Sequence, residues 1–252
     1  MKRRYQVWIG LALMACCAGS CAHGDKIARH RYECSGRLAK AIQKYEARKY
    51  GSAKAILDDV KLQCAGNPVS DTAGYYCAMV LARMKMYAEA RHEFTRFTQD
   101  FPRSPFLEEA QFRIGYCVFK SALSVDRDQT ETREAERLFK DFLESYPSSN
   151  FADSARFYLK ATVGKLAEKE FESAQFYQKI GEKEAAVVCY KVFINDYPAS
   201  SYTTQVRLNL GQMLVELGRK AEAREVLDAL VAEEKNSDIA KKAHELLRRC
   251  GE

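Results

Sequence analysis

The chain has 252 residues, of which 47% are hydrophobic and 29% are charged, so it is long enough to bury a core and too apolar to be disordered throughout. The net charge of +6 includes Lys2, Arg3 and Arg4, and the excess that remains is too mild for a nucleic-acid-binding protein, which carries a basic patch or stripe. The four histidines and nine cysteines show no zinc-type spacing and no CxxC pair, so we expect neither a metal ion nor another cofactor.

The N-terminus has the form of a secretory signal peptide. Met1 to Arg4 is a short basic stretch, and Tyr5 to Ala15 is an apolar run of eleven residues interrupted only by Gln6 and Gly10. A bilayer span takes about 20 apolar residues, whereas a basic start followed by about 7–15 apolar residues is typical of a signal peptide. Residues 1–15 are therefore predicted to be removed on export.

The signal ends in a sequence that resembles a bacterial lipobox. Leu13-Met14-Ala15 precedes Cys16, which we predict to carry the diacylglycerol and palmitate of a lipoprotein. Cys21 is the alternative, and it is weaker because Ala18 stands where the motif usually has Leu. Cys17 follows Cys16 where Asp would retain a lipoprotein in the inner membrane. We therefore expect a lipid anchor in the cell outer membrane, a periplasmic orientation and a flexible tether over residues 16–29; a signal that is never lipidated is the other interpretation.

Export also makes disulfide formation possible, and one pair of cysteines fits the expected helix geometry. Cys34 and Cys64 lie about equally far from a predicted helix turn near Lys49–Tyr50, so an antiparallel helix pair would bring them side by side. The remaining cysteines on apolar helix faces are interpreted as small core residues: Cys77, Cys117 and Cys189.

A recurring pattern is the most informative feature of the chain. In three full copies an Ala is followed at +4 and +7 by aromatic residues and at +12 by Pro: Ala90, Phe94, Phe97 and Pro102; Ala135, Phe139, Phe142 and Pro147; Ala186, Tyr190, Phe193 and Pro198. Two partial copies lack the proline: Ala53, Leu57 and Val60; Ala223, Leu227 and Leu230. Upstream of each copy stands a small residue where two helices must approach closely: Ala41, Ala78, Gly115, Ala174 and Gly211. Paired antiparallel helices with a period of about 34 residues form the tetratricopeptide repeat (TPR) pattern.

The spacing has a direct physical meaning. Steps of +4 and +7 keep apolar residues on one face of a helix, and the proline ends that helix because it cannot donate the next hydrogen bond. The third repeat contains an insertion at about Ser121–Thr130, and Phe151–Ile180 is predicted to be one long helix because it contains no proline. A last helix over Asp238–Arg249 would cap the open end. The predicted fold is all-α: a TPR solenoid of about five antiparallel helix pairs with a C-terminal capping helix.

Three segments carry a more specific resemblance. Ser104–Phe112 (SPFLEEAQF), Val125–Thr130 (VDRDQT) and Phe171–Tyr177 (FESAQFY) resemble the BamD (YfiO-type) family of outer-membrane lipoproteins, over about residues 30–235. The resemblance implies a component of the β-barrel assembly (BAM) complex that docks on the periplasmic domains of the barrel subunit BamA, contacts other BAM lipoproteins and receives unfolded outer-membrane proteins. The chain departs from the family's usual form in its Cys-rich first repeat and in the two cysteines of its lipobox.

The first helices of repeats 1–3, within residues 30–149, are expected to line a substrate groove. Aromatic side chains interleaved with Arg and Lys suit a peptide that has an aromatic end and a free carboxylate, because Arg offers bidentate hydrogen bonds. The predicted groove residues are Tyr45, Tyr75, Tyr76, Met79, Arg83, Phe112, Arg113, Tyr116, Phe119 and Lys120. The alternative is that these aromatic side chains pack between helices.

Residues 150–252 are predicted to be a platform for partner proteins. By resemblance this half meets BamA, with exposed contacts at Arg207, Arg219, Lys220 and Arg224; the alternative for each is an ordinary solvated charge. We expect no catalysis, because GxSxG, HExxH and P-loop motifs are absent from the sequence. The other function left open is a periplasmic TPR scaffold lipoprotein that serves the cell-wall or division machinery.

Overall fold

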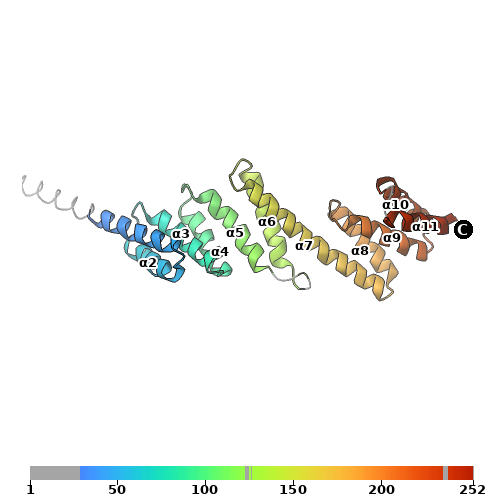
Figure 1. Ribbon diagram of the computed structural model, residues 1–252, viewed down its shortest axis with the longest axis horizontal. Helices are drawn as coiled ribbons and strands as arrows, with labels where there is room; N and C mark the ends of the chain where they lie inside the picture. The colour runs from blue at the N-terminus through green and yellow to red at the C-terminus, as the bar shows by residue number, and fades with distance from the viewer. Residues whose placement is uncertain (1–28, 123–124, 126, 235–237, 252) are drawn as a thin grey trace, which may run out of the picture. The chain divides into compact units, whose positions relative to one another are not determined.

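The computed structural model describes residues 29–122, 125, 127–234 and 238–251. Within these ranges the regular secondary structure is entirely α-helical, as predicted (Figure 1). The predicted signal peptide and both candidate lipidation sites, Cys16 and Cys21, lie outside the described residues. In the part of the chain that is described, no helix is both long enough and apolar enough to cross a membrane.

The helices follow one another in the order that the repeat pattern predicts. A first helix covers residues 29–46. The helices after it are α2 (Tyr50–Gln63), α3 (Ser70–Arg83), α4 (Tyr87–Asp100), α5 (Leu107–Ser121), α6 (Thr130–Ser145), α7 (Ala152–Lys179), α8 (Lys183–Asp196), α9 (Thr203–Glu216), α10 (Lys220–Glu233) and α11 (Asp238–Gly251). Taken two at a time they are five TPR-type helix pairs, and α11 is the predicted capping helix. The long helix is confirmed as α7, with 28 residues.

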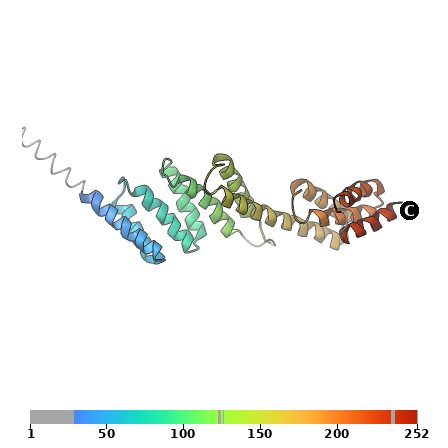
Figure 2. The ribbon, with the colours of Figure 1, turned by 45° about the horizontal axis from the view of Figure 1, so that its top comes forward.

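The chain divides into two compact units, one ending at Cys117 and the other beginning at Val118 within α5. In the first unit α2, α3 and α4 lie side by side, each against the next (Figures 1 and 2). In the second unit α6 packs on α7 and α7 on α8, and the succession continues to α11, which contacts both α9 and α10. The interpretation of residues 30–149 and 150–252 as functional halves rests on the repeats and stays a prediction.

The residues of the repeat pattern form the core. Every Ala and every +4 and +7 residue of the five copies is at most 4% exposed, from Ala53 to Leu230. The small residues upstream are buried as well, and Gly211 shows why: a Cβ atom there would lie 2.4 Å from Cδ2 of Leu227. Helices α9 and α10 therefore approach as closely as they do because position 211 has no side chain.

The helix ends also follow the pattern. Helices α4, α6 and α8 stop at the residue before a Phe-Pro or Tyr-Pro pair, and each aromatic adopts a non-helical conformation with ψ between 52° and 61°. The turns inside the pairs use positive φ: 87° at Gly181 and 75° at Gly218, and also 57° at Arg48 and 62° at Lys85. The insertion of the third repeat lies between α5 and α6, where buried Gln129 donates to the carbonyl oxygens of Val125 and Arg127.

Candidate peptide-binding site

One exposed cation lies among aromatic rings in the first unit. Nε of Arg83, in the last turn of α3, donates to the hydroxyl of Tyr45 at 3.1 Å. The Tyr45 ring meets Tyr76 edge-on, with centroids 5.3 Å apart, and Tyr50 at 5.7 Å. We call Tyr45, Tyr50, Tyr76 and Arg83 the Arg83 cluster. It joins the first two helix pairs, because Tyr45 lies on the helix over residues 29–46 and Arg83 on α3.

The guanidinium of Arg83 is available to an external anion. Arg83 is exposed, and within the described residues its hydrogen-bond partner is the Tyr45 hydroxyl, with no carboxylate paired to it. The hydrogen bond with Tyr45 raises the pKa of Arg83, so the side chain stays charged. A guanidinium has five donors in a fixed fork, so four N–H groups remain for a carboxylate. The Arg83 cluster thus combines the aromatic rings and the guanidinium that suit a peptide with an aromatic end and a free carboxylate.

Three of the predicted groove residues are instead part of the core. Tyr75, Met79 and Phe112 are 5%, 7% and 4% exposed. The Tyr75 ring stacks on Phe106 at 4.4 Å and also contacts Phe97 of α4. These side chains therefore pack between helices, which was the alternative interpretation of the aromatic positions.

Arg113 already has a carboxylate partner. Its Nη2 and Nε atoms donate to Oε1 of Glu109, one helical turn earlier, at 2.8 and 3.1 Å. The guanidinium carbon also lies 5.8 Å from the Phe112 ring centroid and 5.9 Å from that of Tyr116. The ion pair makes Arg113 a weaker receptor for a peptide carboxylate than Arg83.

The last two predicted groove residues belong to the second unit. Phe119 lies 5.3 Å, centroid to centroid, from Tyr158 of α7, and Nζ of Lys120 lies 5.9 Å from the Phe119 ring. Of the ten residues predicted for the groove, the structure brings Tyr45, Tyr76 and Arg83 into one exposed or half-buried cluster. The sequence analysis missed Tyr50 and Glu109. Glu109 was detectable, because an acid four residues before an Arg on a helix is a standard pairing.

Tyr75 leads to a prediction about alkaline pH. Burial, followed by its hydrogen bond with the Glu109 carboxylate, raises the pKa of Tyr75 well above the ordinary value of 10. Because the folded-state pKa is the higher one, the protonated phenol stabilises the fold below about pH 10, and this contribution is lost as the pH rises further. We expect the free energy of unfolding to fall above pH 10 by up to about 1.4 kcal/mol per pH unit, and Tyr75→Phe to remove this part of the slope.

Urea unfolding at pH 9, 10 and 11 measures this slope, with half-buried Tyr146→Phe as the control. A slope that Tyr75→Phe leaves unchanged would contradict the assignment.

The four residues predicted for the partner platform are largely engaged within the chain. Arg207 pairs with Glu233, and Arg219 binds Glu222 through two nitrogens and reaches Glu184 at 3.0 Å. Arg224 Nη2 donates to the carbonyl of Cys250 at 3.2 Å, where it caps the C-terminal end of α11. Lys220 is exposed and forms no ion pair with any residue that the structure describes. Arg219 and Lys191 lower the pKa of Glu222 to about 2, so this network is charged at neutral pH.

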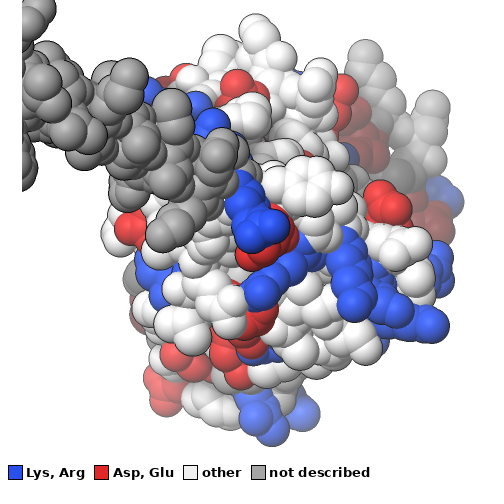
Figure 3. Space-filling view, turned by 90° about the vertical axis from the view of Figure 1, so that its left-hand side faces the viewer, with Lys and Arg blue, Asp and Glu red and all other residues white. Residues whose placement is uncertain are grey.

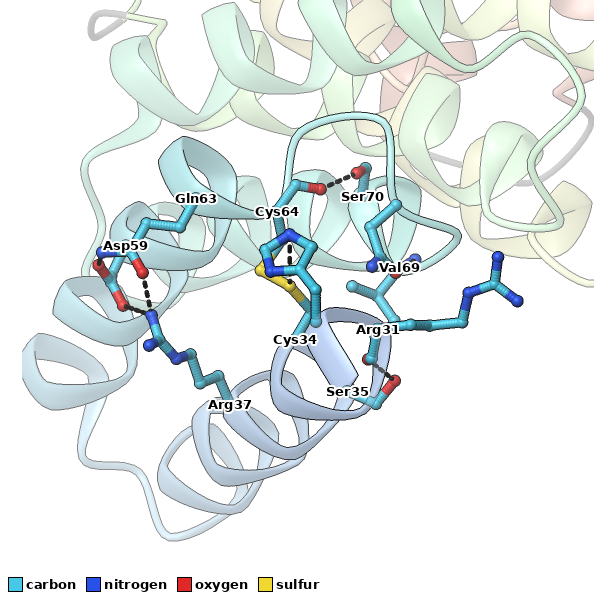
Figure 4. Close-up of a disulfide and its surroundings, with 11 residues drawn as sticks. Arg31, Cys34, Ser35, Arg37, Asp59, Gln63, Cys64, Val69 and Ser70 are labelled. Carbon is cyan, nitrogen blue, oxygen red and sulfur yellow. Dashed lines mark hydrogen bonds and ion pairs between the residues drawn. A yellow bond between two sulfur atoms is a disulfide. The ribbon is translucent and has the colours of Figure 1, made fainter. Parts of the chain in front are cut away.

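The predicted disulfide joins the first helix to the end of α2 (Figure 4). The Cys34 and Cys64 sulfurs are 2.08 Å apart, their Cα atoms are 5.9 Å apart, and both residues are 1% exposed. On the same two helices Nη1 of Arg37 donates to Oδ2 of Asp59 at 2.7 Å. Cys77 and Cys117 are buried free thiols, as predicted, and burial raises the pKa of each to about 12.

Charge on the exposed surface is mixed. The face of the first unit in Figure 3 carries Lys and Arg interspersed with Asp and Glu. Among the ion pairs of the first unit, Nζ of Lys54 lies 2.7 Å from Oδ2 of Asp58, one helical turn later on α2. The described residues contain no group of three His, Cys, Asp or Glu side chains placed to hold a metal ion.

Consecutive helix pairs with the TPR spacing and a C-terminal capping helix define a tetratricopeptide-repeat protein. The family model of YfiO, described as an outer membrane lipoprotein, matches residues 35–229, and the chain belongs to this family. The resemblance seen in the sequence is thereby confirmed.

Curated relatives carry the name outer membrane protein assembly factor BamD. The protein of Caulobacter vibrioides is 29% identical over 138 residues, which span 55% of this chain and 45% of that protein. The protein of Rickettsia prowazekii is 23% identical over 210 residues, 81% of each chain, and that of Neisseria gonorrhoeae is 22% identical over 209 residues, 79% of this chain and 78% of the relative.

Solved TPR structures are also similar at low sequence identity. The TPR domain of P58(IPK) is 14% identical with a TM-score of 0.44, over 86% of this chain and 58% of that one. The TPR2AB domain of yeast Sti1 is 13% identical with a TM-score of 0.40, over 87% of this chain and 98% of that one.

Proposed function

We propose that this chain is a non-catalytic component of the outer-membrane β-barrel assembly machinery, which takes part in the assembly and insertion of barrel proteins by binding the barrel subunit and unfolded substrates. The observation that carries the proposal is the match of the outer membrane lipoprotein family model to residues 35–229, which includes most of the helix pairs. Relatives named as assembly factors for outer membrane proteins support it.

Copurification tests this role directly. The full chain, tagged at its C-terminus and extracted from envelopes in mild detergent, is expected to bring down a BamA-like barrel subunit, other BAM lipoproteins and outer-membrane barrel proteins. Recovery of cell-wall or division proteins without a barrel subunit would favour the scaffold alternative and refute the assembly role.

The anchor is proposed at Cys16, with Cys21 as the alternative. A lipid on either residue would hold the chain at the outer membrane on its periplasmic side. Such an anchor would be stable because diacylglycerol supplies two acyl chains, whereas a single acyl chain binds a membrane only weakly. Mass spectrometry of the N-terminal peptide distinguishes the two, because processing at Cys16 leaves Cys17 and Cys21 in the mature chain whereas processing at Cys21 removes Cys16 and Cys17.

For the substrate we propose a peptide with an aromatic side chain and a free carboxylate, bound at the Arg83 cluster. The exposed guanidinium would receive the carboxylate, and the Tyr50 and Tyr76 rings beside it would contact the aromatic group. Hydrogen bonds to charged groups contribute about 1.5–3 kcal/mol each, so this contact would dominate the affinity for a short peptide.

Arg83→Glu is the sharpest test of this site. Loss of the charge-assisted bonds and repulsion of the carboxylate should weaken binding of a peptide that ends in Phe by at least about tenfold. Fluorescence anisotropy with a labelled peptide measures it, and amidation of the peptide's C-terminus should produce a similar loss. Exposed Lys40→Glu makes the same charge change on the first helix and should have little effect. Equal binding by wild type and Arg83→Glu would rule out the Arg83 cluster as the receptor.

Arg113→Glu is a less informative test of the groove than Arg83→Glu. It breaks the pair with Glu109 and places two acids one helical turn apart, so a loss of binding could reflect a weakened fold.

Residues 150–252 are proposed as the platform for the barrel subunit. Arg207, Arg219 and Arg224 form contacts between helices, so they would support the platform by holding α8, α9, α10 and α11 together, while Lys220 would contact a partner. In the full chain, Lys220→Glu should weaken copurification of the barrel subunit without changing the melting temperature. Arg219→Glu should lower both.

A further inference from the structure

A surface cavity in the first unit has no part in the Arg83 cluster. It has a volume of about 500 Å³ and lies between the loop that joins α2 to α3 and the last turns of α4. Ligand sites typically have volumes of about 300–1,000 Å³. A second cavity of about 400 Å³ adjoins it, since Asn67, Asp100 and Phe101 line both.

Two aromatic rings and a glycine form the apolar wall of the larger cavity. The Phe97 and Phe101 ring centroids are 5.5 Å apart and their planes are inclined by 40°. A Cβ atom at Gly74 of α3 would lie 3.4 Å from an atom of each ring. A side chain longer than that of alanine at position 74 would therefore extend into the space that the two rings line.

The charged side chains around the cavity neutralise one another. Oε2 of Glu93 receives Nζ of Lys61 and Nη2 of Arg96, each at 2.7 Å. Nε of Arg96 also lies 4.0 Å from Oδ2 of Asp100. Two cations and two anions leave no net charge, so the surroundings favour an uncharged ligand over an acidic or basic one.

The disulfide fixes the loop that forms the opposite wall. The carbonyl oxygen of Cys64 accepts the backbone N–H of Asn67 at 3.0 Å and the hydroxyl of Ser70 at 2.9 Å. Cys64 is itself bonded to Cys34, and Gly66 has a φ of 74° that L side chains rarely adopt. The loop over residues 65–68 therefore directly follows a cross-linked residue, Cys64 (Figure 4).

We propose that this cavity binds the aromatic side chain of an uncharged peptide segment from a partner protein, and that the Cys34–Cys64 disulfide keeps it in its binding shape. An aromatic guest can meet the Phe97 and Phe101 rings in the edge-to-face or offset arrangements that such rings prefer. The guanidinium of Arg96 at the rim can lie over the outer face of the same guest. The site shares no lining residue with the Arg83 cluster, which is proposed to bind a carboxylate.

Ligand-observed ¹⁹F NMR with the full chain in detergent tests the proposal. The probe is N-acetyl-4-fluorophenylalaninamide, which is neutral, and a dissociation constant on the order of 1 mM is expected from its size. Gly74→Leu fills the space before the two rings and should weaken binding by at least about tenfold. Gly164→Leu is the matched control, since Gly164 is a helical glycine at which a Cβ atom would have no neighbour within 4 Å. Phe101→Leu, which removes one ring from a half-buried position, covers the case in which Gly74→Leu fails to fold.

Two further measurements separate this site from the Arg83 cluster and test the role of the disulfide. Arg83→Glu should leave the probe's affinity unchanged, whereas reduction of the disulfide should weaken it about three- to tenfold by lowering the fraction of competent protein. Absence of binding, or equal binding by wild type, Gly74→Leu and Phe101→Leu, would overturn the site. Loss of binding in Arg83→Glu would assign the probe to the Arg83 cluster and also overturn it. Undiminished binding by reduced protein would overturn the role of the disulfide.

Discussion

Replacement of both Cys34 and Cys64 by Ala should destabilise the first unit by about 3–4 kcal/mol. The disulfide closes a loop of 30 residues, and its removal increases the conformational entropy of the unfolded chain. The two sulfurs lie in the same apolar cluster as Leu57 and Val60, so the cross-link holds the first helix on α2. Because a domain of this size is stable by only about 5–15 kcal/mol, the loss is a large part of the total.

Hydrogen exchange of the α2 and α3 amides measures this loss separately in the first unit, as a fall in protection of about two to three orders of magnitude. The double Ala variant and reduced wild type should agree, since both lack the cross-link. Cys189→Ala, at a half-buried free thiol in the second unit, is the control and should leave these amides unchanged. If the variant keeps wild-type protection, the disulfide does not stabilise the unit.

The periodic part of the fold was predictable because the spacing within each copy of the repeat determines which of its residues pack together. The +4 and +7 residues must share a face in any α-helix, and a buried face needs small residues opposite to it, so Phe94, Tyr190 and Leu227 could be placed in the core before any coordinates. The turns were less predictable. Arg48 and Lys85 adopt the positive φ that glycine supplies in the later pairs, and nothing in their side chains indicates it.

The candidate site was only partly predictable, because helical spacing gives a direction but not the neighbour that lies there. Tyr75 and Tyr76 are adjacent and chemically identical, yet Tyr75 is buried under Phe106 while Tyr76 faces the Arg83 cluster. The intramolecular contacts of the predicted platform residues could not be predicted for another reason. The partner of Arg207 is 26 residues away and one partner of Arg219 is 35 residues away, so their contacts come from the packing of successive repeats.

Gly211→Leu should destabilise the second unit by about 3 kcal/mol or more. The first atom of any side chain at this position would lie 2.4 Å from Cδ2 and 2.7 Å from Cγ of Leu227, and Leu227 is fully buried. Leucine is a better helix former than glycine by about 0.5–1 kcal/mol, so the gain in propensity offsets only part of the steric cost. Urea or thermal unfolding gives the net change.

A matched comparison isolates the steric cause. Gly164→Leu makes the same substitution on a helix of the same unit, where a Cβ atom would have no neighbour within 4 Å, and should be neutral or mildly stabilising. The contact with Leu227 can be tested by a double-mutant cycle. Leu227→Ala alone costs about 2–5 kcal/mol because it leaves a cavity, but the combination with Gly211→Ala should cost less than the sum of the two, because the Cβ atom at position 211 enters the space that the shortened side chain at 227 leaves. Additive costs would show that Gly211 is needed for some reason other than contact with Leu227. A combined cost below the sum would establish that the small residue of the first helix and the +4 residue of the second depend on each other through their contact. This contact is the packing rule that defines the repeat.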